Sequence, residues 1–228
     1  MIIEVAPPPN GLWHIGRQGD GILTFKLPDR ADNSEPRGGN RFDSFNGDYG
    51  TLYFGSTLEV CFAETLGRFR PNPILAALVS DEWESSHKMG PGSIPADWRS
   101  SRVILRVGLD QPLPFVDIFA PDTIAELALR SEVMASLVQL GVHDLDLGDI
   151  TGKDRRVTRF IAQYLADLRD DEGLPVYSGI RYVSRLGEHL ECWAVFEGTM
   201  LFELERISIE RNSPALEVIA ERYQLTVH

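Results

Sequence analysis

Residues 50–66 read GTLYFGSTLEVCFAETL, and this stretch predicts a strand that leads directly into a helix. The segment TLYFGS is short, apolar and rich in residues that favour strands, which is typical of a buried strand. Ser56 and Glu59 then form an S-x-x-E capping box, which predicts the start of a helix that continues to about Phe69. We therefore expect a strand and a helix here, joined without a long loop.

The flanking sequence predicts a mixture of strands, helices and two irregular stretches. Ile22–Leu27 predicts a strand, and residues 28–50 are dense in Gly, Asp, Asn and Pro, which predicts a long loop. Residues 82–101 predict a second irregular stretch, an excursion from the domain. Further strands are expected in RVILRVGL, PFVDIF, Val176–Ser184, Glu191–Phe196 and Met200–Ile209, and further helices from Thr123 to Leu140, over 153–169 and after Ser213. Because strands and helices do not alternate regularly, the sequence predicts an α+β fold in a single domain, with a mixed β-sheet core and flanking helices.

Composition and charge exclude several classes of protein. The 228 residues carry a formal net charge of −12, which disfavours direct binding to nucleic acid but leaves room for a small basic pocket. The N-terminus does not resemble a signal peptide, and no apolar run is long enough to cross a membrane. We therefore expect a cytoplasmic protein. Cys61 and Cys192 form no disulfide or zinc pattern, and we interpret them as small core residues rather than nucleophiles.

The common motifs of nucleotide binding and hydrolysis are absent from the sequence. No GxGxxG follows a strand into a helix, and no GxxxxGK[ST], G-x-S-x-G or HExxH occurs. The five histidines are scattered, which predicts surface or locally bonded residues and no metal site.

A few polar residues within apolar segments remain as candidates for a site. Glu64 shares its helix face with Val60 and Cys61, and the alternative is a solvated glutamate paired with Arg68. Arg41 lies in a glycine-rich loop, where a guanidinium could bind a phosphate or diphosphate. The alternative is a solvated loop arginine.

Three other residues carry the same ambiguity. Arg17 is a ligand-binding or a solvated arginine, and Tyr53 is a core ring or a stacking platform. Ser184 is a turn hydroxyl or a site hydroxyl. None of these residues supports a function alone.

Together, the segments that carry these residues resemble the RES-domain family. They are, in order, WHIGR, GGNRF, GTLYFGSTLEVCFAETL, YSGIRYVSR and WAVFE. The resemblance covers a motif-bearing core of about residues 13–196, and a strand and a helix in 200–228 complete the domain of residues 1–228. It implies a fold similar to that of ADP-ribosyltransferase toxins. Two departures from the family pattern are Gln18 after Arg17, and Asn40-Arg41-Phe42-Asp43 where G-R-W-N is usual.

The resemblance also implies a role for each candidate residue. Glu64 would stabilise the positive charge that develops on the ribose when the nicotinamide–ribose bond of NAD is cleaved. Arg41 and Arg17 would hold the phosphates, and Tyr53 would pack against nicotinamide or ribose. Ser184 would bind the ligand or position the glutamate.

In this family the expected setting is a toxin–antitoxin pair. The resemblance implies NAD as substrate, inorganic phosphate as an optional co-substrate, and no prosthetic group or metal. The expected partner is an antitoxin with a helix-turn-helix domain, in a homo-oligomer or a larger toxin–antitoxin complex. Two alternatives stay open, an ADP-ribosyltransferase that modifies a host protein, and a non-catalytic module that binds a nucleotide or a partner.

Overall fold

The structure, a computed structural model, describes residues 1–19, 21–29, 35–74 and 90–228. Within these ranges eight strands form one mixed sheet. In spatial order they are β1 (Glu4–Val5), β6 (Phe115–Asp117), β7 (Gly179–Val183), β8 (Glu191–Phe196), β3 (Thr51–Gly55), β2 (Leu12–Arg17), β5 (Arg102–Leu109) and β9 (Leu201–Ser208). Neighbouring strands are antiparallel except β6 and β7, which are parallel. The predicted α+β class with a mixed sheet is confirmed.

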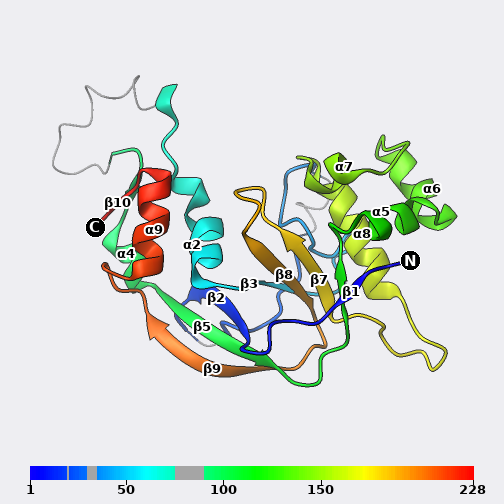
Figure 1. The fold of residues 1–228 in the computed structure, drawn as a ribbon, viewed down its shortest axis with the longest axis horizontal. Coiled ribbons are helices and arrows are strands. Elements are labelled where there is room, and N and C mark those ends of the chain that lie inside the picture. The colour runs from blue at the N-terminus through cyan, green and yellow to red at the C-terminus, as the bar shows by residue number, and fades with distance from the viewer. Residues whose placement is uncertain (20, 30–34, 75–89) are drawn as a thin grey trace.

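Helices cover the sheet in two groups. Within the described residues the helices are α2 (Leu58–Leu66), α4 (Ala96–Ser100), α5 (Pro121–Ala128), α6 (Ser131–Gln139), α7 (Leu147–Thr151), α8 (Arg155–Asp167) and α9 (Pro214–Tyr223), with a 3-10 turn over Gly67–Phe69. Helices α2, α4 and α9 gather beside β2 and β5, and α5–α8 lie beside β6 and β7 (Figure 1). A small parallel sheet of β4 (Ser93–Ile94) and β10 (Thr226–Val227) lies with the first group.

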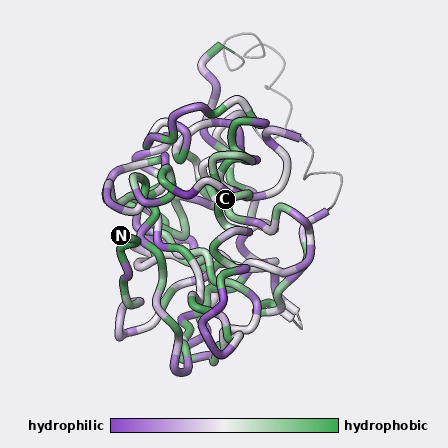
Figure 2. Tube along the Cα trace, turned by 90° about the vertical axis from the view of Figure 1, so that its right-hand side faces the viewer, coloured by the Kyte–Doolittle hydropathy of each residue, from purple (hydrophilic) through white to green (hydrophobic). Residues whose placement is uncertain are grey.

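The two faces of the sheet bury separate hydrophobic cores, because successive side chains of a strand point to opposite faces. In β3, Tyr53 packs against the larger core, which contains the buried faces of α2, α8 and α9. Leu52 and Phe54 belong to the smaller core on the other face, together with Trp193. Hydrophilic segments lie at several loops along the outline of the chain trace (Figure 2).

The predicted strand over Ile22–Leu27 is wrong. Residues 21–27 form a turn and an irregular segment, and Ile22, Leu23 and Phe25 pack against the smaller core. Their apolar character is thus explained by partial burial against this core and not by strand pairing. The loop predicted after it is confirmed for the described residues 35–50, which contain only turns and bends.

The predicted excursion over residues 82–101 is also wrong in its described part. Residues 82–89 lie outside the described residues, but 93–100 contain β4 and α4. Ile94 is fully buried and Trp98 is 5% exposed, so this part belongs to the core.

The other predicted elements are present, several with shifted bounds, and the predicted strand RVILRVGL coincides with β5. The helices expected from Thr123 to Leu140 are α5 and α6. The predicted strand over Val176–Ser184 begins later, at Gly179, and the strand over Glu191–Phe196 has the predicted bounds. The predicted last helix begins at Pro214, after Ser213 as its N-cap.

Candidate active site

Helix α2 begins directly after β3, as predicted, but its cap is a different residue. The N-cap is Thr57, whose hydroxyl accepts a hydrogen bond from the backbone N–H of Val60. Gly55 allows this close turn, because a Cβ at this position would lie 2.8 Å from the side chain of Val60. The predicted capping box of Ser56 and Glu59 is therefore wrong.

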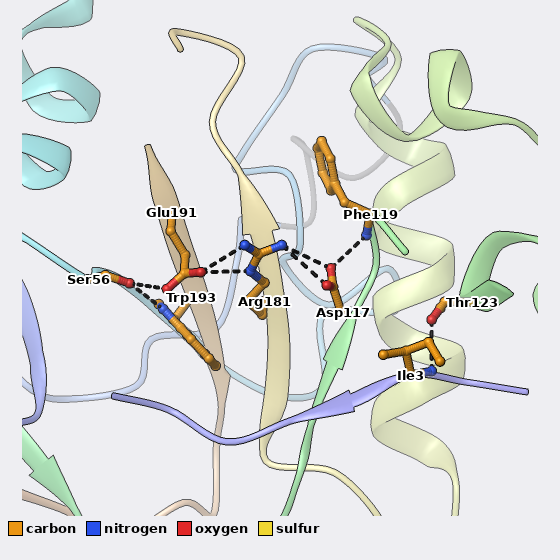
Figure 3. A network of polar contacts seen from close by, with 8 residues as sticks. All are labelled: Ile3, Ser56, Asp117, Phe119, Thr123, Arg181, Glu191 and Trp193. Carbon is orange, nitrogen blue, oxygen red and sulfur yellow. Dashed lines mark hydrogen bonds and ion pairs between the residues drawn. The ribbon is translucent and has the colours of Figure 1, made fainter. Parts of the chain in front are cut away.

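The hydroxyl of Ser56 takes part instead in a network that connects four strands (Figure 3). Ser56 donates to Glu191, and the indole of Trp193 donates to Ser56 at 2.9 Å. Arg181 lies between Glu191 and Asp117 and donates to both carboxylates, at 2.8 Å and 3.2 Å. This network fixes the end of β3, where α2 starts, to β8, β7 and β6.

The start of α2 and the end of β7 lie at the same edge of the sheet. Val183 at the end of β7 pairs with Glu191 at the start of β8, and Cys192 pairs with Gly55 at the end of β3. The residues that follow β7 and β3 are therefore close in space, although they are far apart in the sequence.

Glu64 and Ser184 meet at this edge. The hydroxyl of Ser184 donates a hydrogen bond to Glu64 Oε1 and accepts one from the backbone N–H of Leu186 at 3.0 Å. Ser184 is buried, whereas Glu64 is exposed and lines a pocket. The Ser184 hydroxyl thus fixes the orientation of a carboxylate that faces the pocket. The alternative pairing of Glu64 with Arg68 is not observed, and Arg68 lies over the Phe69 ring.

Arg41 also lines the pocket, but its guanidinium already donates hydrogen bonds to main-chain carbonyl groups. It donates to the carbonyl oxygens of Ile150 at 2.5 Å and Gly152 at 3.1 Å, at the C-terminal end of α7. Burial, with the charges of Arg185 and Arg155, lowers the pKa of Arg41 to about 10, so it is charged at neutral pH. Arg41 therefore links the loop to α7 and adds positive charge to the pocket.

Tyr53 holds this loop in place. Its hydroxyl donates to Asp43 at 2.8 Å and accepts from the backbone N–H of Phe42 at 3.0 Å. Burial and the charge of Asp43 raise the pKa of Tyr53 well above its usual value. The ring lines the pocket, while the hydroxyl orders the segment that carries Arg41.

We expect Tyr53→Phe to lower the free energy of unfolding by about 1.5 kcal/mol, because it removes two hydrogen bonds and leaves the Phe42 N–H without its partner. Tyr49→Phe is the matched control, because the buried Tyr49 hydroxyl has no hydrogen-bond partner among the described residues. Urea unfolding of both variants measures the difference. Equal stability of the two variants would contradict this role of Tyr53.

These residues line a single pocket of about 530 Å³, within the range of small-molecule sites. Its walls come from β2, β3, α2, β7, β8, the start of α8, the loop at Asn40-Arg41, residues 184–186 and Arg70. Four arginines line it, namely Arg41, Arg70, Arg155 and Arg185. Glu64 is the only carboxylate among the described lining residues. The pocket is thus suited to an anionic ligand that also has a centre of developing positive charge.

His14 lines the pocket as well, which the sequence interpretation did not anticipate. Its Nδ1 lies 2.8 Å from the carbonyl oxygen of Tyr53, so Nδ1 carries the hydrogen and donates. Burial lowers the pKa of His14, which outweighs the opposite effect of this hydrogen bond, and the ring is neutral at pH 7. This hydrogen bond spans 39 positions, so the prediction of a surface or locally bonded histidine is wrong for His14, which belongs to the site.

Both cysteines line the pocket and are buried. Burial raises the pKa of Cys61 to about 12, and it also raises the pKa of Cys192. The thiols are therefore protonated at neutral pH, which agrees with their interpretation as core residues.

Arg17 is the one candidate that the structure does not place in the pocket lining. It is exposed at the end of β2, opposite Arg102. The other four candidates, Arg41, Tyr53, Glu64 and Ser184, all line the pocket. The sequence did not indicate Arg155, Arg185 or Arg70, because isolated arginines follow no local pattern.

Two other features are absent from the described residues. No group of three or more His, Cys, Asp or Glu side chains could hold a metal ion there. No helix in the same ranges is both long and apolar enough to cross a membrane.

Comparison with protein families matches residues 12–216 to the RES domain. Among solved structures, the chain is similar to one in the crystal structure of the M. tuberculosis MbcT-MbcA toxin-antitoxin complex. The two chains are 12% identical with a TM-score of 0.47, over 98% of this chain and 90% of that chain. No curated protein sequence matches the chain.

Proposed function

The chain belongs to the RES-domain family, and on that basis we propose that its pocket binds NAD and cleaves the bond between nicotinamide and ribose. The observation that carries this proposal is the contact of Ser184 with Glu64 in a pocket lined by arginines. The contact joins residues 120 positions apart. It gives an oriented carboxylate for the ribose and positive charge for the diphosphate in one place.

The reaction breaks the bond between the nicotinamide nitrogen and the ribose carbon. The electron pair of this bond leaves with nicotinamide, which departs as a neutral molecule, and positive charge develops on the ribose ring. The carboxylate of Glu64 stabilises this charge and orients the ribose hydroxyls. Ser184 keeps the carboxylate in position, and the Tyr53 ring packs against nicotinamide or ribose. Because nicotinamide is a good leaving group, the site needs no general acid.

An oxygen of the acceptor then bonds to the ribose carbon: phosphate attacks through an unprotonated oxygen, whereas water releases a proton to the solvent. Inorganic phosphate as acceptor gives phosphorolysis, and water gives hydrolysis. The surplus of arginines in the lining supports phosphate, because a second anion can be accommodated beside the diphosphate. A protein side chain as acceptor would make the enzyme an ADP-ribosyltransferase.

Family membership also supports a biological role as the toxin of a toxin–antitoxin pair. The toxin would deplete NAD in the cytoplasm until an antitoxin with a helix-turn-helix domain binds it. The net charge of −12 fits a division of labour in which the antitoxin makes the DNA contacts.

The function is tested by mass analysis of NAD incubated with the purified protein, with and without inorganic phosphate. We expect ADP-ribose-1″-phosphate in the presence of phosphate. Formation of free ADP-ribose at the same rate with and without phosphate would show that the reaction is hydrolysis and not phosphorolysis. If NAD is consumed only when a cell lysate is added, and ADP-ribose is found on protein, the ADP-ribosyltransferase alternative holds. If nicotinamide is released under none of these conditions, the chain is a binding module.

A further inference from the structure

Three of the arginines that line the pocket are Arg41, Arg155 and Arg185, and we call them the anion cradle. Burial lowers the pKa of Arg41, and the charges of Arg185 and Arg155 lower it further, so both lie near enough to repel the Arg41 guanidinium. Like charges repel one another, so the cradle is more favourable with an anion between the groups than without one.

Two members of the cradle are held by main-chain carbonyl groups. Arg41 donates to Ile150 and Gly152, and Arg155 donates from Nη1 to the carbonyl oxygen of Gly39. These contacts fix both guanidinium groups and use part of their donors. Arg41 and Arg155 therefore provide fixed positive charge more than free donors.

Arg185 differs from both. Its side chain is exposed, and no hydrogen bond or ion pair connects it to another described residue. It directly follows Ser184, whose hydroxyl holds Glu64. A free guanidinium thus lies one residue from the group that orients the carboxylate.

From this arrangement we infer that Arg185 binds the diphosphate of the substrate, with Arg41 and Arg155 as the fixed charges behind it. The inference rests on the proposed function and changes the assignment made from the sequence, in which Arg41 and Arg17 held the phosphates. A free guanidinium can donate two parallel hydrogen bonds to phosphate oxygens. Because Arg185 directly follows Ser184, which contacts Glu64, the diphosphate would lie next to the ribose.

The test measures the dissociation constant of ADP-ribose by calorimetry for wild type, Arg185→Ala and Arg185→Lys. Arg211→Ala is the matched control, because Arg211 is an exposed arginine outside the pocket lining. We expect Arg185→Ala to weaken binding by at least about tenfold, Arg185→Lys to restore part of the affinity, and Arg211→Ala to have no effect. For NAD cleavage, Arg185→Ala should raise KM by a similar factor and change kcat by less than about threefold.

Nicotinamide riboside separates this role from a general effect on the site, because it has the same scissile bond and no diphosphate. The rate of its cleavage should be equal in wild type and Arg185→Ala. Equal affinity of the two proteins for ADP-ribose, or an equal loss for both substrates, would overturn the assignment of Arg185 while leaving the proposed function intact. Failure of the wild type to bind either ADP-ribose or NAD would instead overturn the proposed function.

Discussion

Glu64→Gln is expected to reduce the rate of nicotinamide release from NAD by about 10³-fold. The amide keeps the size of the side chain and can still accept the hydrogen bond from Ser184, so the pocket keeps its shape. What disappears is the negative charge beside the ribose, in a lining where Glu64 is the only carboxylate among the described residues. Because the charge is needed mainly when the bond breaks, kcat should fall much more than the affinity for NAD.

Glu59→Gln is the control for this experiment. It makes the same change of charge on the same helix, but Glu59 does not line the pocket. We expect its activity to stay within about twofold of wild type, since its contribution is limited to the helix N-terminus. Full activity of a folded Glu64→Gln protein would show that the Glu64 carboxylate is not required for catalysis.

Arg181→Met is expected to lower the free energy of unfolding by about 2–3 kcal/mol. The arginine is partly buried between Glu191 and Asp117, and its removal leaves two carboxylates without their cation. We expect this loss of stability to be smaller than for a fully buried ion pair, because water reaches part of the network. Arg206→Met is the matched control, since Arg206 pairs with Glu203 on the surface, and we expect a change below about 0.5 kcal/mol. Similar losses in the two variants would contradict a special role for Arg181.

The effect of Arg181→Met should also depend on pH. Burial alone would raise the pKa of Glu191, but hydrogen bonds from Ser56 and Arg181 outweigh it, and the pKa lies below its usual value. A carboxyl group whose pKa is lowered by folding stabilises the fold at a pH above its pKa in the unfolded chain, about 4.3. This contribution is lost as the pH falls through its pKa in the folded protein. The stability difference between wild type and Arg181→Met should therefore be complete at pH 7 and shrink below about pH 4. A difference that stays constant from pH 7 to pH 3 would contradict this origin.

The elements that the sequence predicted well are those with a strong local signal. The apolar run of Glu191–Phe196 and the Ser213-Pro214 helix start agree with β8 and α9. The predictions that failed depend on contacts from distant parts of the chain. Ser56 fits the local pattern of a helix cap, but Glu191 and Trp193 bind its hydroxyl, and Thr57 caps the helix in its place. Ile22–Leu27 has the composition of a strand, but Ile22, Leu23 and Phe25 pack against the smaller core without strand pairing, and Leu27 is exposed.

The site was predictable only as a set of separate residues. Glu64, Ser184, Tyr53 and Arg41 were each ambiguous alone, and the resemblance to a family grouped them before the structure placed them together. The sequence could not show that Arg41 donates a hydrogen bond to the carbonyl oxygen of Ile150 in α7, because this contact spans 109 positions. It also could not show that Arg185 is free, since a free side chain is defined by contacts that it does not make.

The most direct test of the account is the time course of nicotinamide release when the purified wild-type protein is mixed with NAD and inorganic phosphate, with equal amounts of Glu64→Gln as the blank. We expect nicotinamide to appear in proportion to the NAD consumed with wild type, and at the background rate with the variant. Consumption of NAD at equal rates by both proteins, or without release of nicotinamide, would contradict cleavage of the nicotinamide–ribose bond at Glu64.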